Sequence, residues 1–220
     1  GRLISGTASI PFLLDMEVHI RYLVALPLLI VAELVVHRRM RPLVQLFLER
    51  NLIPETAVTR FEAALASAFR LRNSVLAELL LIAFVYGIGI LVVWRQYISL
   101  DAATWYAVPS AEGSQLSLAG MWYGYVSLPI FQFLLLRWYF RLFIWTRFLW
   151  QVSRLELKIL PTHPDRCGGL GFLAVTIQAL SPLLLAQGAL LAGLMASRIF
   201  YAGAKLPEYK LELIGLVAVM

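Results

Sequence analysis

The chain has 220 residues, of which 60% are hydrophobic and only 15% are charged, and its mean hydropathy is +0.78. This composition excludes an ordinary soluble domain. Several windows approach twenty residues with one charge or none, which is the length that a helix needs to cross hydrocarbon. The short alternating segments typical of outer-membrane barrels do not occur in the sequence. The sequence therefore predicts an all-α, polytopic helical membrane protein.

The net charge of +6 comes from 19 Lys and Arg against 13 Asp and Glu. The arginines lie beside the apolar windows, where positive charge sets the orientation in the membrane and attracts anionic headgroups. We therefore expect the lipid bilayer and its anionic headgroups as partners, and no nucleic acid. The single cysteine, Cys167, excludes an internal disulfide.

Five apolar segments follow one another along the chain. We predict four complete transmembrane helices and a truncated fifth, at residues 20–36, 75–93, 118–136, 170–196 and 211–220. The last segment would cover only about 15 Å, half of a bilayer. Because the chain starts without Met and stops inside this apolar run, we expect the full protein to be longer.

Two polar segments, residues 38–72 and 137–169, hold 13 of the 19 Lys and Arg. The positive-inside rule places both segments on the cytoplasmic side of an inner membrane. In the first segment we expect two short helices separated at residues 51–54, the second with an apolar stripe formed by Val58, Phe61, Leu65 and Phe69. Residues 137–157 combine arginines with many aromatic residues. They predict an interfacial helix that continues the third span and bends onto the inner membrane surface.

Two acidic residues lie inside predicted spans, since Glu33 and Glu78 are each three residues from a cytoplasmic end. His37 shares a helical face with Glu33, and His163 and Asp165 lie on the same side of the membrane. Together these five residues could ligate a divalent metal or relay protons. Alternatively each acid pairs with an arginine, for which the candidates are Arg70, Arg72 and Arg137. The ligands come from separate segments without tight spacing, which favours pairing.

The segment at residues 160–172 joins the second polar segment to the fourth span and allows three interpretations. Thr162 and Asp165 have the spacing of a capping box. Three glycines after Asp165 would permit a left-handed backbone or close packing. Glycines before a helix can also hold an anion or an acidic headgroup. The candidate anion-binding residues are Arg166, Gly168 and Gly169. The spacing matches neither a P-loop nor a dinucleotide fingerprint, which favours capping and packing.

Residues 161–173 read Pro-Thr-His-Pro-Asp-Arg-Cys-Gly-Gly-Leu-Gly-Phe-Leu. This segment resembles the PTHPDxxGGLGFL segment of a group of uncharacterised bacterial polytopic membrane proteins. The resemblance extends to residues 33–39 and 61–74, and thus across most of the chain. It implies a multi-spanning membrane fold and carries no activity with it.

Three classes of function fit the sequence. Gln132, Gln178 and Ser181 lie near prolines in predicted spans, as polar groups do along a path for a small solute or ion. The aromatic-rich stretch at 138–150 and the modest size indicate a non-catalytic scaffold subunit, either of a larger membrane complex or of a homo-oligomer. An inner-face metal-binding protein or enzyme is the third hypothesis. The sequence contains no nucleophile elbow, paired-histidine helix or kinase signature, which disfavours an enzyme. The amides within the spans favour transport slightly.

Overall fold

The computed structural model describes residues 11–88, 105–108, 115–202, 209 and 214. Within these residues the regular secondary structure is helical apart from one pair of two-residue strands. Three helices are long and apolar enough to cross a membrane: Met16–Glu49, Leu118–Ser153 and Gly171–Tyr201. A fourth candidate is the pair Glu55–Arg72 and Val75–Ile88, bent by 48°. The predicted all-α class, with helices suited to a membrane, is confirmed.

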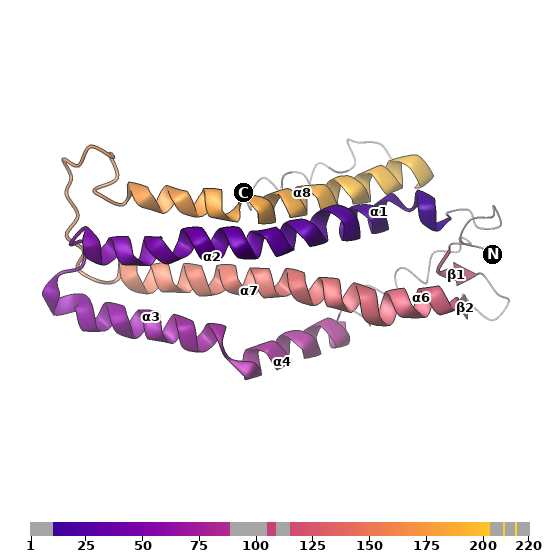
Figure 1. Cartoon of the computed structure of the whole chain (residues 1–220), viewed down its shortest axis with the longest axis horizontal. Coiled ribbons are helices and arrows are strands. Elements are labelled where there is room, and N and C mark those ends of the chain that lie inside the picture. The colour runs from indigo at the N-terminus through magenta and orange to yellow at the C-terminus, as the bar shows by residue number, and fades with distance from the viewer. Residues whose placement is uncertain (1–10, 89–104, 109–114, 203–208, 210–213, 215–220) are drawn as a thin grey trace. The chain divides into compact units, whose positions relative to one another are not determined.

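The chain forms two compact units. The outer unit, as we call it from the predicted orientation, contains Gly1–Leu28, Leu79–Leu136 and Leu184–Met220. The inner unit contains Leu29–Glu78 and Arg137–Leu183. Four helices contribute residues to both units: α2 (Leu26–Glu49), α4 (Val75–Phe84), α7 (Leu128–Ser153) and α8 (Val175–Ala202). Figure 1 gives the order of the helices along the chain.

Two π-helical turns in the outer unit each precede a proline. The short helix α1 (Met16–His19) continues through a π-helical turn, η2 (Ile20–Ala25), into α2. Likewise α6 (Leu118–Trp122) continues through the π-helical turn η5 (Tyr123–Ser127) into α7. Pro27 and Pro129 each follow the first residue after such a turn. Because proline lacks an N–H and its ring clashes with the carbonyl four residues earlier, a wider turn relieves both helices.

A short connection precedes α6 in the outer unit. The strands β1 (Ala107–Val108) and β2 (Gln115–Leu116) pair antiparallel. Ser117 caps α6, since its Oγ accepts a hydrogen bond of 3.0 Å from the Gly120 N–H. A Cβ on Gly120 would lie 2.1 Å from the Tyr106 carbonyl oxygen. This close approach requires glycine and fixes the connection against the start of the helix.

The inner unit contains the C-terminal parts of α2 and α7. After α2 the chain is interrupted at residues 51–54, where the sequence predicts a break. The backbone of Asn51 has a positive φ of 51°. After it come the 3-10 turn η3 (Glu55–Ala57), the helix α3 (Val58–Arg72) and the helix α4 (Val75–Phe84). Another 3-10 turn, η6 (Gly171–Ala174), leads into α8.

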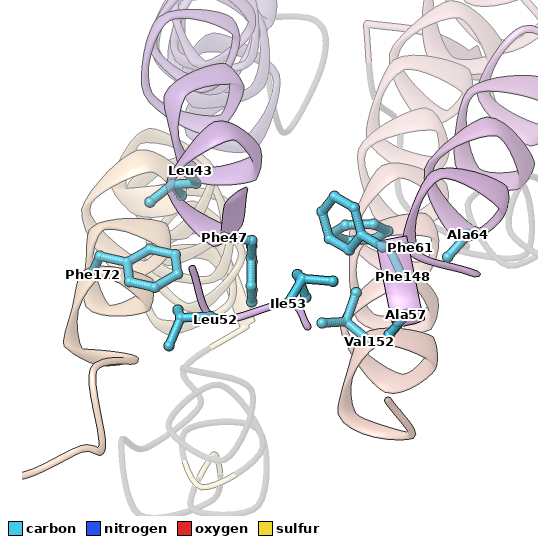
Figure 2. Packing of buried hydrophobic residues seen from close by; sticks show 10 residues of the cluster. All are labelled: Leu43, Phe47, Leu52, Ile53, Ala57, Phe61, Ala64, Phe148, Val152 and Phe172. Atoms are coloured by element: carbon cyan, nitrogen blue, oxygen red, sulfur yellow. The ribbon is translucent and has the colours of Figure 1, made fainter. Parts of the chain in front are cut away.

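A phenylalanine cluster holds the inner unit together (Figure 2). The Phe47 ring of α2 lies 5.1 Å from the Phe172 ring of η6 and 5.8 Å from the Phe61 ring of α3, measured between centroids. Phe61 also contacts Phe148 of α7 at 5.8 Å and is fully buried. The other buried members are Leu43, Leu52, Ile53, Ala57, Ala64 and Val152. Four segments of the chain thus share one apolar core.

The structure corrects two details of the prediction. The expected first short helix of residues 38–72 is not separate, because α2 continues to Glu49. The helix expected at 137–157 continues the third predicted span as part of α7, which runs from Leu128 to Ser153, and its interfacial location stays a prediction. Phe69 was expected to continue the apolar stripe of α3, but its ring is 48% exposed. The buried core extends along α3 only as far as Ala64 and its partly buried neighbours. Residues 89–93 of the second predicted span and 211–220 of the fifth lie outside the described residues, apart from residue 214.

Candidate functional site

The two acids that the sequence places inside spans both bind arginines of α7. Glu33 of α2 accepts two hydrogen bonds from Arg141, of which the one from Nη2 to Oε1 measures 2.8 Å. Glu78 of α4 lies 3.5 Å from Arg137. Arg137 and Arg141 are four residues apart and therefore share a face of α7. Each acid thus pairs with an arginine, as the pairing alternative predicted, although Arg141 was not among the named candidates.

We call Glu33, Arg72, Glu78, Arg137 and Arg141 the charge cluster. The guanidinium groups of Arg141, Arg137 and Arg72 all act electrostatically on the Glu33 carboxylate. The side chains of Glu33, Glu78 and Arg137 are each between 44% and 55% exposed. Arg141 is more enclosed, at 22% exposure. The cluster therefore lies at the surface of the inner unit.

The described residues contain no group of three or more His, Cys, Asp or Glu side chains that could hold a metal ion. Glu33, His37, Glu78, His163 and Asp165 thus do not form one ligand set. The physical reason is that both acids of the spans bind guanidinium groups. His37 is exposed on α2. His163 and Asp165 contact each other, at 2.8 Å between the imidazole Nδ1 and the carboxylate Oδ1.

Asp165 organises the glycine-rich loop before α8. Its Oδ1 accepts hydrogen bonds from the N–H groups of Cys167, at 2.9 Å, and Gly169, at 3.0 Å. Its Oδ2 accepts one of 2.8 Å from Gly171, the first residue of η6. Desolvation raises the pKa of Asp165, but these backbone hydrogen bonds and the contact with His163 outweigh it and hold the pKa well below its ordinary value.

This arrangement replaces the predicted capping box and bears on the predicted anion site. Asp165 binds N–H groups two, four and six residues after itself, whereas the acid of a capping box reaches back three residues. The N–H of Gly169, one of the predicted anion ligands with Arg166 and Gly168, is bound to the Asp165 carboxylate. Arg166 is exposed. The Asp165 carboxylate thus occupies the N–H group of Gly169 that the predicted anion site would use.

The glycines have the conformational role that the sequence predicted. Gly168 and Gly169 have positive φ angles of 68° and 97°. A Cβ on Gly168 would lie 2.2 Å from Cγ2 of Ile159, and one on Gly171 would lie 2.9 Å from Oδ2 of Asp165. Both the backbone angles and the packing therefore require glycine in this loop.

Contacts with the turn after α2 hold the loop in place. The Lys158 N–H donates a hydrogen bond of 2.8 Å to the carbonyl of Leu52. Arg50 donates a longer one, of 3.5 Å, to the carbonyl of Gly169. The Arg50 guanidinium also lies 5.2 Å from the centroid of the Phe172 ring. The loop is therefore fixed to the same turn that closes the phenylalanine cluster.

The residues predicted to line a transport path are distributed over both units. Gln178 of α8 is exposed and accepts a hydrogen bond of 3.0 Å from Arg39 of α2. Ser181 donates one of 2.9 Å to the backbone carbonyl of Gln178, within its own turn. Gln132 is half-buried on the part of α7 that belongs to the outer unit. Gln178 thus joins two helices of the inner unit, as the charged pairs do.

Buried charges in the outer unit were not predicted as a site. The Asp15 carboxylate accepts hydrogen bonds from the Trp105 indole, at 2.9 Å, and from the Val18 N–H, at 3.2 Å. Arg21 is only 8% exposed and binds Glu17 and the hydroxyl of Tyr123. The four-residue spacing of Glu17 and Arg21 was a signal for their pairing. The contact of Asp15 with Trp105 joins residues 90 positions apart, which a single sequence cannot reveal.

Searches of protein-family models, curated proteins and solved structures found no match to this chain. The resemblance of residues 161–173 to uncharacterised bacterial membrane proteins therefore stays a prediction.

Proposed function

We propose that the chain is an integral protein of the bacterial inner membrane that crosses the bilayer four times, at residues 20–36, 75–93, 118–136 and 170–196, and begins a fifth crossing at 211–220. The three long apolar helices support the spans at 20–36, 118–136 and 170–196, and the helical residues Val75–Ile88 support the span that begins at residue 75. The concentration of Lys and Arg in residues 38–72 and 137–169 supports a cytoplasmic location for these segments.

The single cysteine allows a direct test of this orientation. Cys167 is exposed in the loop before α8. A membrane-impermeant maleimide added to intact cells should leave Cys167 unlabelled and should label it after the membrane is opened. As a matched control, Ser110→Cys in a Cys167→Ser background should be labelled in intact cells, because residue 110 lies between the second and third proposed spans and therefore outside the cytoplasm. Labelling of Cys167 in intact cells would reverse the proposed topology.

Within this topology, the chain acts as a non-catalytic subunit of a larger membrane complex. The observation that carries this role is the use of the polar residues on the helices. Glu33 with Arg141, Glu78 with Arg137, and Arg39 with Gln178 each join two helices of the inner unit. Polar groups committed to such pairs stabilise a helical framework and are not directed at a substrate.

The exposed aromatic face of α7 is the surface that such a subunit would offer. Tyr139, Phe143 and Trp150 are 41%, 57% and 58% exposed and follow one another at helical spacing. Aromatic side chains are enriched at interfaces between proteins. The proposed occupant is a cytoplasmic helix of a different membrane protein, since these aromatic residues lie in the segment 137–169, which the proposed topology places in the cytoplasm.

Site-specific photocrosslinking in native membranes tests this role. A photoreactive residue in place of Phe143 should give one discrete cross-linked product, containing a second protein in constant ratio. The matched control is the same residue in place of Ile177, which is 64% exposed on α8. A product of twice the chain mass would indicate a homo-oligomer. Identical products from both positions, or none from Phe143, would refute the proposed interface.

Transport of a small solute or ion remains the second proposal, and one observation favours it. Gln187 of α8 is 8% exposed, and its amide Nε2 has no hydrogen-bond partner among the described residues. A buried unpaired amide inside a candidate span is the kind of group that a polar solute would contact. Flux in liposomes that is lost in Gln187→Leu but kept in Gln178→Leu would support transport, whereas absence of flux in the wild type would exclude the solutes tested.

A further inference from the structure

The charge cluster of the inner unit has more positive than negative groups. Three arginines, Arg72, Arg137 and Arg141, accompany two acids, Glu33 and Glu78. Arg141 is engaged by Glu33 and Arg137 by Glu78. Among the described residues, Arg72 has no carboxylate within ion-pair distance. Its guanidinium lies 5.6 Å from the centroid of the half-exposed Phe69 ring. The cluster therefore carries one positive charge in excess.

Exposed apolar side chains neighbour the members of this cluster in the sequence on three of its four helices, α2, α4 and α7. Ile30 and Leu34 of α2 are 58% and 60% exposed. Val75 and Leu76 at the start of α4 are 69% and 68% exposed, and Tyr139 of α7 is 41% exposed. Exposed charges and exposed apolar groups occur together at the boundary between headgroups and hydrocarbon. At the boundary between headgroups and hydrocarbon, an arginine without a negative partner is costly. An anionic headgroup beside it offsets this cost.

We propose that the charge cluster binds the phosphate of an anionic phospholipid, with Arg72 and Arg137 as its ligands. This site rests on the proposed membrane insertion, and in the proposed orientation it belongs to the cytoplasmic leaflet. A guanidinium group binds phosphate oxygens through two parallel hydrogen bonds, which a half-exposed arginine can supply. The exposed apolar side chains of α2 and α4 would then contact the acyl chains. Glu78 limits the affinity, because its carboxylate binds Arg137 and therefore competes with the phosphate for this arginine.

Native mass spectrometry of the full chain in mild detergent tests the site, with phosphatidylglycerol and phosphatidylcholine as the added lipids. The wild type should retain phosphatidylglycerol in preference to phosphatidylcholine. Arg72→Gln should weaken phosphatidylglycerol binding by about tenfold, the effect of losing one charge-assisted contact. Arg72→Lys should lie in between, because it keeps the charge and loses the paired hydrogen bonds. Glu78→Gln should strengthen binding, since it removes the carboxylate that competes for Arg137.

Arg60→Gln is the matched control. Arg60 is exposed on the same helix, twelve residues before Arg72 and thus about 18 Å away along α3. It should leave the lipid preference unchanged. Equal losses for the two variants would mean diffuse attraction and would overturn the proposal, as would equal retention of both lipids by the wild type. Displacement of phosphatidylglycerol by millimolar inorganic phosphate would identify a free-phosphate site and overturn the lipid assignment.

Alkaline carbonate extraction of the same membranes separates this proposal from the one on which it rests. A wild-type chain that is extracted by carbonate is not integral to the membrane, and the proposed function fails. A chain that resists extraction but shows no preference for phosphatidylglycerol refutes the lipid site alone. The melting temperature of each variant confirms that a change in lipid binding does not come from unfolding.

Discussion

The phenylalanine cluster provides the most direct test of how the inner unit is stabilised. Phe61 is fully buried between Phe47 and Phe148. Phe61→Ala removes this ring and leaves a cavity, which costs roughly 3–5 kcal/mol for a buried phenylalanine. The matched control is Phe69→Ala, because Phe69 lies on the same helix with its ring 48% exposed. Removing that half-buried ring should cost only about 1 kcal/mol.

Thermal unfolding of the full chain in mild detergent, followed by circular dichroism, measures the difference. For a domain of this size, 1 kcal/mol corresponds to roughly 2–4 °C in Tm. Phe61→Ala should therefore lower the Tm by about 6–20 °C, and Phe69→Ala by about 2–4 °C. The large shift expected for Phe61→Ala requires that the unfolded ring is exposed to water. In hydrocarbon the ring would lose little, because lipid is as apolar as the core. Equal shifts for the two variants would refute both the core and its proposed location outside the hydrocarbon.

Three further outcomes follow from the same structure. Gly168→Ala should lower the Tm by several degrees, because it strains a positive φ and places a Cβ 2.2 Å from a neighbouring side chain, whereas Gly188→Ala, with no atom within 4 Å, should not. The lowered pKa of Asp165 stabilises the fold fully above the ordinary value of about 3.9, and this contribution is lost as the pH falls below it. The Tm of Asp165→Asn should therefore depend less on pH between about 5 and 3 than that of the wild type. A double-mutant cycle of Glu33→Gln and Arg141→Gln should give a coupling of about 1 kcal/mol, and additive effects would argue against the ion pair.

The sequence was sufficient for those features that depend on composition or on neighbouring residues. Long apolar windows predicted helices suited to a membrane, and the structure has them. The break at residues 51–54 was recognised from a proline and an asparagine, and Asn51 has the left-handed conformation that asparagine tolerates. The arginine partner of Glu78 was correctly included among three candidates, since Arg137 binds it. These features are local or follow from charge alone.

The remainder depends on contacts between distant residues. Glu33 binds Arg141, 108 positions away, because α2 and α7 lie against each other in the inner unit. With seven arginines in residues 38–72 alone, spacing could not select this partner. The three hydrogen bonds that Asp165 accepts depend on the backbone angles of Gly168 and Gly169, which a residue pattern does not determine. The sequence therefore indicated that Asp165 matters, but it assigned the wrong N–H groups to it.

The polar residues within the candidate spans distinguish the two proposed functions. In the inner unit, Glu33, Glu78 and Gln178 each bind an arginine from another helix. A solute that bound to these groups would first have to break an ion pair or a hydrogen bond. The free energy of that step would lower the affinity for the solute. In the outer unit, the buried amide of Gln187 has an unpaired donor, so a solute could bind it without such a cost. A transport function therefore depends on Gln187, whereas a scaffold function depends on the pairs of the inner unit.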